Sequence, residues 1–400
     1  MALLRRLGNH IGIKAMRTHF ARKFKPLALA VGGSLLLSVI AGCNRPPNSP
    51  APSPSATNNV AAAIVTPAQI VAQLAAINVT NGPVTAPQLT EWKSGFTQLL
   101  AAGPAAIPAI EAFLLKNLDV GFEPHGNAQL LGVASLRLAL ISASTRIGGS
   151  DAVALAGRIL AATADPQELV LVAGFLQQVE PGKHRAACAT AARETLAIAA
   201  SGSWDGRDVA PLFAMLKTFG TTNDVGELTR YANTWFAYTA ITLAQWPDGA
   251  GIPALIRIVQ NADGRVTLGR DVYCRMLAEA AATSTLAADV LVAEVKRNAL
   301  EVGTWPAVGR ALAGESLHLP DFFAGSTNAV AVAPGARTYH LSVGNQNYRE
   351  ESPAENTTPK ELGARLALVD RLLEATTNPA AIDAFEAARV ALASRLPKPR

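Results

Sequence analysis

A series of amphipathic segments fills the chain from about residue 60 to residue 317 and limits what the chain can fold into. In each segment apolar residues recur three and four positions apart, as helices that bury one face require. Thr66-Pro67, Ala86-Pro87 and Gly103-Pro104 each begin such a segment, and proline is favoured in the first turn of a helix. No comparable run alternates with a period of two. The sequence therefore predicts an all-α fold.

Two of these segments are similar to each other. Ala105–Ile110 reads AAIPAI and Ala250–Leu255 reads AGIPAL, and each is followed after a polar turn by another helix. Pro166, Pro211 and Pro253 are spaced by 45 and then 42 residues, which is near the period of HEAT repeats. Residues 59–318 therefore resemble a HEAT-like α-solenoid, whose helices stack repeat upon repeat. The alternative is an irregular helical bundle.

The pattern changes after residue 318. In the segment 319–358, Asn328–Ala333 and Arg337–Val343 flank a Pro334-Gly335 turn, which predicts a small β-hairpin. The polar stretch 344–359 is expected to be a loop. Residues 359–400 hold two amphipathic segments, 359–376 and 378–395, joined by Thr377-Asn378-Pro379. We expect a C-terminal αα-hairpin that caps the stack or pairs with another chain.

The first 42 residues are organised like a targeting segment. Basic residues, Lys25 the last of them, precede the apolar run Leu27–Ile40, and Ala41-Gly42-Cys43 follows. The run is shorter than the roughly 20 residues that a transmembrane helix needs. This layout resembles the signal peptide and lipobox of bacterial lipoproteins, which implies that residues 1–42 are removed and Cys43 is lipidated. An uncleaved anchor and an ordinary signal peptide are the alternatives.

The resemblance also implies a location. Lipid on Cys43 would hold the protein to a membrane of the bacterial cell envelope, and the Pro- and Ser-rich residues 43–58 would form a disordered tether. Asn44 stands where some lipoproteins carry an Asp that retains them in the inner membrane. Because position 44 holds Asn and not Asp, we expect the protein in the outer membrane, facing the periplasm.

Charge argues against a nucleic-acid partner. The chain has 35 basic and 30 acidic residues, but seven of the basic residues and no acidic residue lie in residues 1–42. Without that segment 28 basic residues face 30 acidic ones, a net charge near −2. A nucleic-acid-binding protein is expected to keep a basic surface in its folded part.

Three cysteines occur in the chain. Besides Cys43, the other two are Cys188 and Cys274, which an oxidising envelope would allow to form a disulfide. The alternative is a pair of separate buried thiols on two helices.

Catalytic signatures are absent from the sequence. It contains no GxSxG elbow, P-loop, dinucleotide-binding glycine pattern, HExxH or CxxC, so we expect no enzyme, no cofactor and no metal. The most site-like residues are aromatic, amide and basic side chains that could stack on and hydrogen-bond a sugar or a peptide: Tyr339, His340, Asn347, Tyr348 and Arg349.

Two functions follow from these patterns. The first is a scaffold that binds an unknown envelope protein through a helical-repeat surface. The second is a glycan- or peptide-binding accessory, or an unrecognised enzyme, that uses residues 339–349.

Overall fold

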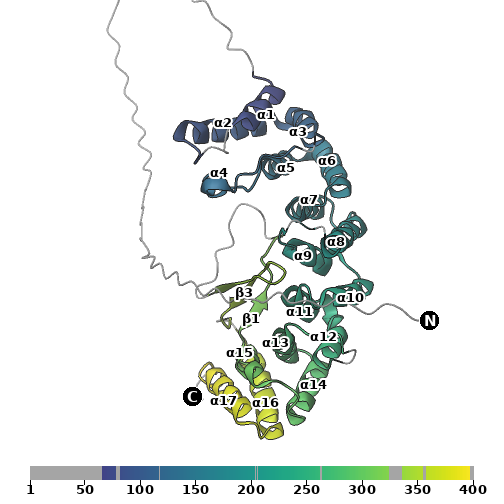
Figure 1. Ribbon diagram of the computed structural model, residues 1–400, viewed down its shortest axis with the longest axis vertical. Coiled ribbons are helices and arrows are strands. Elements are labelled where there is room, and N and C mark those ends of the chain that lie inside the picture. Colours follow the sequence, from purple (N-terminus) through teal and green to yellow (C-terminus); the bar gives the residue numbers. More distant parts are fainter. Residues whose placement is uncertain are drawn as a thin grey trace, which may run out of the picture. The chain divides into compact units, whose positions relative to one another are not determined.

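Helices make up most of the chain in the computed structural model (Figure 1). This confirms the prediction of an all-α fold. The leader 1–42, Cys43 and the segment 43–58 lie outside the described residues. The structure describes residues 65–77, 82–116, 118–202, 204, 206–261, 264–323, 336–354 and 357–396.

Most helices belong to one of two rows, which Figure 1 shows side by side. In the sheet-side row each helix contacts the next along the whole row. This row consists of α2 (Ala86–Ala102), α5 (Leu136–Ile147), α7 (Pro166–Val179), α9 (Ala210–Phe219), α11 (Phe236–Ala244), α13 (Arg270–Ala281), α15 (Trp305–Ala313) and α17 (Pro379–Ala393).

The opposite row pairs with the first. Contacts join α1 to α3, α3 to α6 and α6 to α8, and further along they join α12 to α14 and α14 to α16. This row consists of α1 (Pro67–Ala76), α3 (Ile107–Leu114), α6 (Gly149–Ala162), α8 (Arg185–Ala200), α10 (Thr222–Leu228), α12 (Ile252–Val259), α14 (Thr285–Lys296) and α16 (Pro359–Ala375). Short connecting helices are η1 (Gly103–Ala106), η2 (Pro124–Gly126), α4 (Asn127–Leu131), η3 (Thr229–Tyr231), η4 (Pro247–Gly249) and η5 (Val302–Thr304).

Local capping explains where several helices begin. Thr66 and Gln69 form a capping box at the start of α1, with Pro67 in the first turn. Asp165 accepts hydrogen bonds from the first amides of α7, and Asn378 does the same for α17. The predicted C-terminal helices 359–376 and 378–395 are confirmed as α16 and α17, within two residues at each end.

The two rows also explain the proline spacing. The Ile-Pro helices α3 and α12 both lie in the opposite row, whereas Pro166 and Pro211 begin α7 and α9 of the sheet-side row. The interval from Pro211 to Pro253 therefore compares helices of different rows. Proline suits the first turn of any helix, so its spacing alone does not define a period here.

One helical run among the described residues, Ala86–Leu114, is long and apolar enough to cross a membrane by composition. In the structure α2 ends at Ala102, η1 follows, and α3 starts at Ile107. Gly103 has a φ of +59°, which favours glycine, and a proline comes next. The run is therefore divided into two helices, both of which contact α1 and α5.

A three-stranded antiparallel sheet packs on the sheet-side row, where β3 contacts α11. Its strands are β1 (Ser316–His318), β2 (Arg337–Leu341) and β3 (Gln346–Glu351), in the order β1-β3-β2. A small β-hairpin was correctly predicted, and its strand 337–343 is confirmed as β2. The strand that pairs with β2 is β3, which lies in the stretch expected to be a loop. The predicted partner, 328–333, lies outside the described residues.

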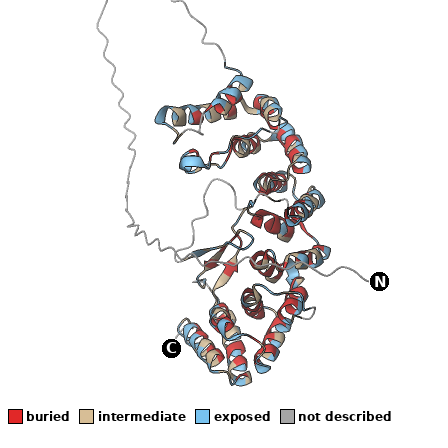
Figure 2. Cartoon of the chain, in the orientation of Figure 1, coloured by how far each residue is buried: buried red, intermediate tan, exposed pale blue. Residues whose placement is uncertain are grey.

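The core follows from this arrangement. Helices of the sheet-side row near the sheet are covered on both faces, and α9 is buried along almost its whole length (Figure 2). Its sequence, APLFAMLKTF, is apolar nearly all round, as a helix enclosed on every side requires.

Candidate functional site

The five residues predicted to contact a ligand lie on the hairpin. Tyr339 and His340 belong to β2, and Asn347, Tyr348 and Arg349 belong to β3. Register places Tyr339 opposite Tyr348 and His340 opposite Asn347. The tyrosine rings stack with centroids 5.3 Å apart, and His340 Nδ1 lies 2.8 Å from Asn347 Oδ1. The structure therefore brings these residues together: Tyr339 pairs with Tyr348 and His340 with Asn347, whereas Arg349 lies opposite Thr338 of β2 and His318 of β1.

The hairpin is fastened to α11 and to the segment before α9. The Tyr238 hydroxyl donates to Asp208 Oδ1 at 2.7 Å and accepts from the backbone amide of Asn347. Asn347 Nδ2 donates to Asp208 Oδ2 at 3.0 Å. The side chain of Gln346, fully buried, accepts hydrogen bonds from the amides of Ala237 and Tyr238 in the first turn of α11. Burial raises the pKa of Tyr238 well above its ordinary value.

A buried ion pair joins the hairpin to α13. Arg275 Nη1 lies 2.5 Å from Glu350 Oε1, and Tyr339 donates its hydroxyl to the other carboxylate oxygen. Burial alone would raise the pKa of Glu350, but the hydrogen bond from Tyr339 and the nearby charges of Arg275 and Arg310 outweigh it and lower the pKa to about 2. Glu350 is thus held as a carboxylate that positions β3.

A second carboxylate holds β1. Glu279 of α13 accepts from the amide of Leu317, whose carbonyl accepts from the side chain of Gln245. Burial raises the pKa of Glu279. The polar side chains beneath the sheet therefore serve to dock the strands.

The two remaining cysteines are free and buried, Cys188 on α8 and Cys274 on α13. The structure therefore has two separate buried thiols, and no disulfide joins Cys188 to Cys274. Burial raises the pKa of Cys188 to about 11 and that of Cys274 to about 12, so both thiols are protonated and unreactive at neutral pH. No cluster of three or more His, Cys, Asp or Glu side chains within the described ranges could hold a metal.

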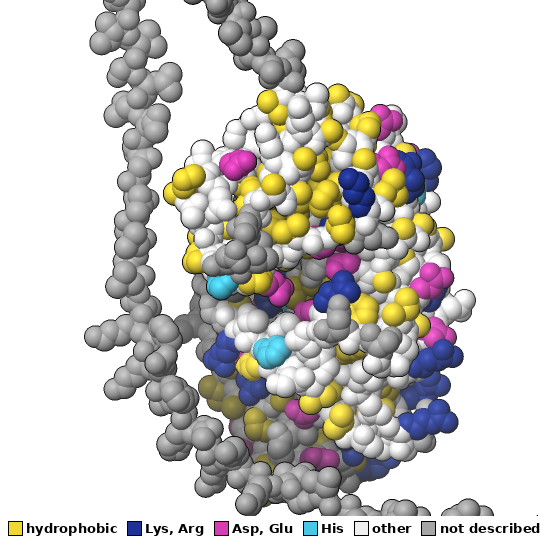
Figure 3. All heavy atoms as spheres, turned by 45° about the horizontal axis from the view of Figure 1, so that its top comes forward, with side chains coloured by type: hydrophobic (Ala, Val, Ile, Leu, Met, Phe, Trp, Pro, Cys, Tyr) yellow, Lys and Arg dark blue, Asp and Glu magenta, His cyan; other side chains and the backbone are white. Residues whose placement is uncertain are grey.

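An open cleft lies beside the hairpin, between α5, α7 and the segment that precedes α9. Its volume is about 1240 Å³, and Asn345 of the hairpin turn reaches its edge. Figure 3 shows this face of the molecule, where acidic side chains lie around a hollow and hydrophobic ones gather above it. We call this feature the acidic cleft, because five carboxylates line it against one arginine, Arg207: Asp119, Glu123, Asp165, Asp208 and Asp321.

The acidic cleft continues into an apolar groove between α2 and α5. The two share Val133 and Ser142 in their linings. The groove has a volume of about 420 Å³. Its apolar lining includes Leu130, which is 50% exposed. The larger apolar side chains of the lining also include Trp92, Phe96, Leu100 and Leu131.

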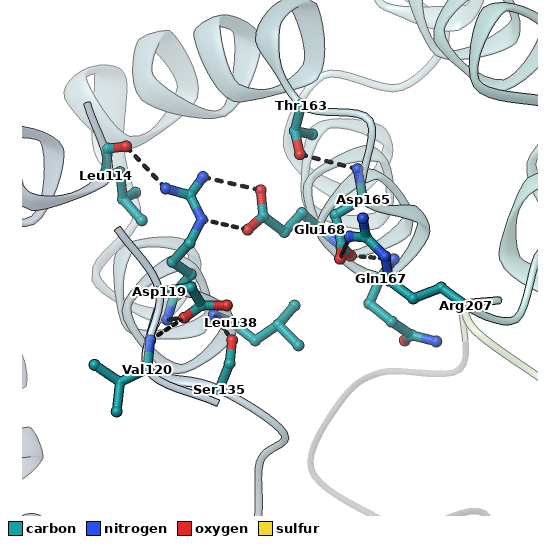
Figure 4. Close-up of polar contacts among 11 residues, drawn as sticks. Leu114, Asp119, Val120, Ser135, Leu138, Thr163, Asp165, Gln167, Glu168 and Arg207 are labelled. Atoms are coloured by element: carbon teal, nitrogen blue, oxygen red, sulfur yellow. Dashed lines mark hydrogen bonds and ion pairs between the residues drawn. The ribbon is translucent and has the colours of Figure 1, made fainter. Parts of the chain in front are cut away.

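Ion pairs join the elements that border the acidic cleft (Figure 4). Arg137 of α5 forms a two-pronged pair with Glu168 of α7, with distances of 2.7 and 3.1 Å, and also donates to the carbonyl of Leu114. The hydrogen bond to Glu168 is the main reason that the pKa of Arg137 is raised. Asp165 caps α7 and pairs with Arg207 at 2.5 Å. Arg137 and Arg207 are thus each paired with a carboxylate.

No local sequence pattern predicts this cleft. Its carboxylates are spread from residue 119 to residue 321, on connecting segments and at helix ends. Only the stacking of α5, α7 and α9 brings those segments to one face. No protein-family model, curated protein or solved structure matches the chain.

Proposed function

We propose that this protein is a lipid-anchored bacterial envelope protein that acts as a scaffold and binds another protein in the acidic cleft. The proposal interprets the two rows as HEAT-like repeats, in which stacked helix pairs offer an extended binding surface. Lipid on Cys43 would hold the chain to the outer membrane, and residues 43–58 would let the folded part extend into the periplasm.

The observation that carries the proposal is the size and openness of the cleft. Its volume of about 1240 Å³ exceeds the roughly 300–1,000 Å³ of typical small-molecule sites, and it continues into the apolar groove. A protein segment would fill both. The ion pair Arg207–Asp165 lies in the lining of the cleft, and Arg137–Glu168 joins α5 to α7 beside it. Both pairs are in place before binding, which lowers the entropic cost of association.

The alternative use of residues 339–349 as a glycan or peptide site has less support. Tyr339, Asn347 and Tyr348 are engaged with Glu350, Asp208 and each other. A ligand would have to displace those contacts, which dock the hairpin.

Site-specific photocrosslinking in intact cells tests the proposal. A photoreactive residue is placed at Gln167 in the acidic cleft, at Leu130 in the apolar groove, and at Asp370, an exposed control position on α16. We expect Gln167 and Leu130 to yield the same crosslinked protein, identified by mass spectrometry, and Asp370 to yield none. If Gln167 and Leu130 do not crosslink to the same protein, the scaffold function is refuted.

A further inference from the structure

From the charge and shape of the joined cleft and groove, we infer that the docked segment belongs to a partner protein and carries lysine or arginine residues beside an apolar stretch. The basic residues of this partner segment bind in the acidic cleft, and its apolar residues bind in the groove between α2 and α5. This inference rests on the proposed function and specifies the chemistry of its partner.

Charge is the first argument. Five carboxylates and one arginine line the acidic cleft, and that arginine, Arg207, already pairs with Asp165. Glu123 and Asp119 are exposed to solvent at the cleft. The cleft therefore presents an excess of negative charge, and a complementary partner is positively charged.

The apolar groove supplies the second argument. Leu130 is 50% exposed, and it lines the groove together with Phe96. Val133 and Ser142 line both cavities, so the groove and the cleft adjoin at these residues. Lys93 and Arg146 are the basic residues of the groove lining, so the excess of carboxylates is confined to the cleft. The joined surface thus has an apolar end and an acidic end.

These two ends exclude simpler occupants. A free polyamine or a divalent cation would satisfy the carboxylates but would leave the groove empty. A purely apolar segment would cover the exposed carboxylates Asp119 and Glu123 without supplying a counter-charge, which is costly. A segment with both characters covers the whole surface.

Peptide binding to the full-length protein in neutral detergent tests the inference. The probe is a short fluorescent peptide with a leucine- and alanine-rich half and a lysine- and arginine-rich half, followed by fluorescence anisotropy. Its controls are a peptide with glutamate in place of every basic residue and a peptide with the basic half alone. We expect the mixed peptide to bind most tightly, the basic half to bind weakly, and the glutamate peptide not to bind.

Variants of the protein locate the binding. Asp119→Asn, Glu123→Gln and Asp321→Asn together should weaken binding of the mixed peptide about tenfold or more. The matched control is Asp370→Asn, Glu374→Gln and Asp383→Asn on α16 and α17, which changes net charge equally and should leave binding unchanged. Leu130→Ser should weaken it about fivefold, whereas Leu286→Ser on α14, 52% exposed, should not.

Three outcomes would overturn the inference: no binding of the mixed peptide, equal binding of the glutamate peptide, or equal binding of the basic half alone. If a shared partner is still crosslinked at Gln167 and Leu130, the scaffold function stands and only the partner chemistry is wrong. If neither experiment detects binding, both proposals fail.

Discussion

At the scale of single residues, the buried ion pair between Arg275 and Glu350 stabilises the docking of the sheet on α13. Both side chains are at most 6% exposed, and removing one charge of a buried pair costs about 3–5 kcal/mol because the other is left uncompensated. Glu350→Gln, which keeps the size of the side chain, should lower the free energy of unfolding at pH 7 by about 3 kcal/mol, measured by chemical denaturation. Glu227→Gln, in an exposed pair with Arg230, should change it by less than about 1 kcal/mol.

The same carboxylate predicts a dependence on pH. The pKa of Glu350 is lowered from an ordinary 4.5 to about 2, so the folded state takes up its proton less readily than the unfolded state. Its contribution to stability is complete above pH 4.5 and is lost as the pH falls toward 2. The difference in unfolding free energy between wild type and Glu350→Gln should therefore shrink across that window. A difference that stays constant down to pH 3 would contradict the lowered pKa.

At the scale of elements, two glycine-to-alanine substitutions should have opposite signs. Gly344 in the turn between β2 and β3 has a φ of +71°, and an added Cβ would lie 2.4 Å from the carbonyl oxygen of Thr234. Gly344→Ala should therefore undock the hairpin and cost about 2 kcal/mol. Gly157, inside α6, has nothing within 4 Å of an added Cβ, so Gly157→Ala should stabilise the protein by about 0.5–1 kcal/mol.

Hydrogen exchange separates these effects by element. Gly344→Ala should speed the exchange of amides in β2 and β3 about tenfold or more, while amides of α6 keep their rates. Gly157→Ala should leave the hairpin amides unaffected. Uniform acceleration throughout the chain by Gly344→Ala would mean that the hairpin does not open as a separate unit.

Helix ends could be predicted because their signals are local. Thr66, Asp165 and Asn378 act on amides two or three residues away, and the sequence shows both partners. The partner of β2 could not be predicted in this way. The inward positions of β3 are Gln346, Tyr348 and Glu350, so the strand reads as a polar loop.

What makes those polar residues fit lies far away in the chain. Gln346 is satisfied by amides of α11, and Glu350 by Arg275 of α13. The same reasoning applies to the acidic cleft, because its carboxylates come from separate connections between helices. Sequence patterns thus identified the helices and strand β2, whereas the pairing of β3 and the surface between helices depend on how the rows stack.

At the scale of the whole molecule, the proposed lipidation of Cys43 would determine where the protein resides. One acyl chain binds a membrane only marginally, whereas two or more hold a protein stably. Cys43→Ser removes the thiol to be acylated, so the protein should lose label from a clickable palmitate analogue and leave the membrane fraction for the soluble part of the envelope. Fractionation followed by immunoblotting measures the second effect.

Two further variants make this experiment decisive. Ser49→Ala, in the same Pro- and Ser-rich stretch, leaves the thiol unchanged and should keep both the label and the membrane association. Asn44→Asp supplies the residue that retains some lipoproteins in the inner membrane, so it should keep the label but shift the protein to the inner-membrane fraction of a density gradient. If Cys43→Ser retained the label, Cys43 would not be the lipidated residue. If it lost the label but stayed with the membrane, an uncleaved leader or a protein surface would be what anchors the chain.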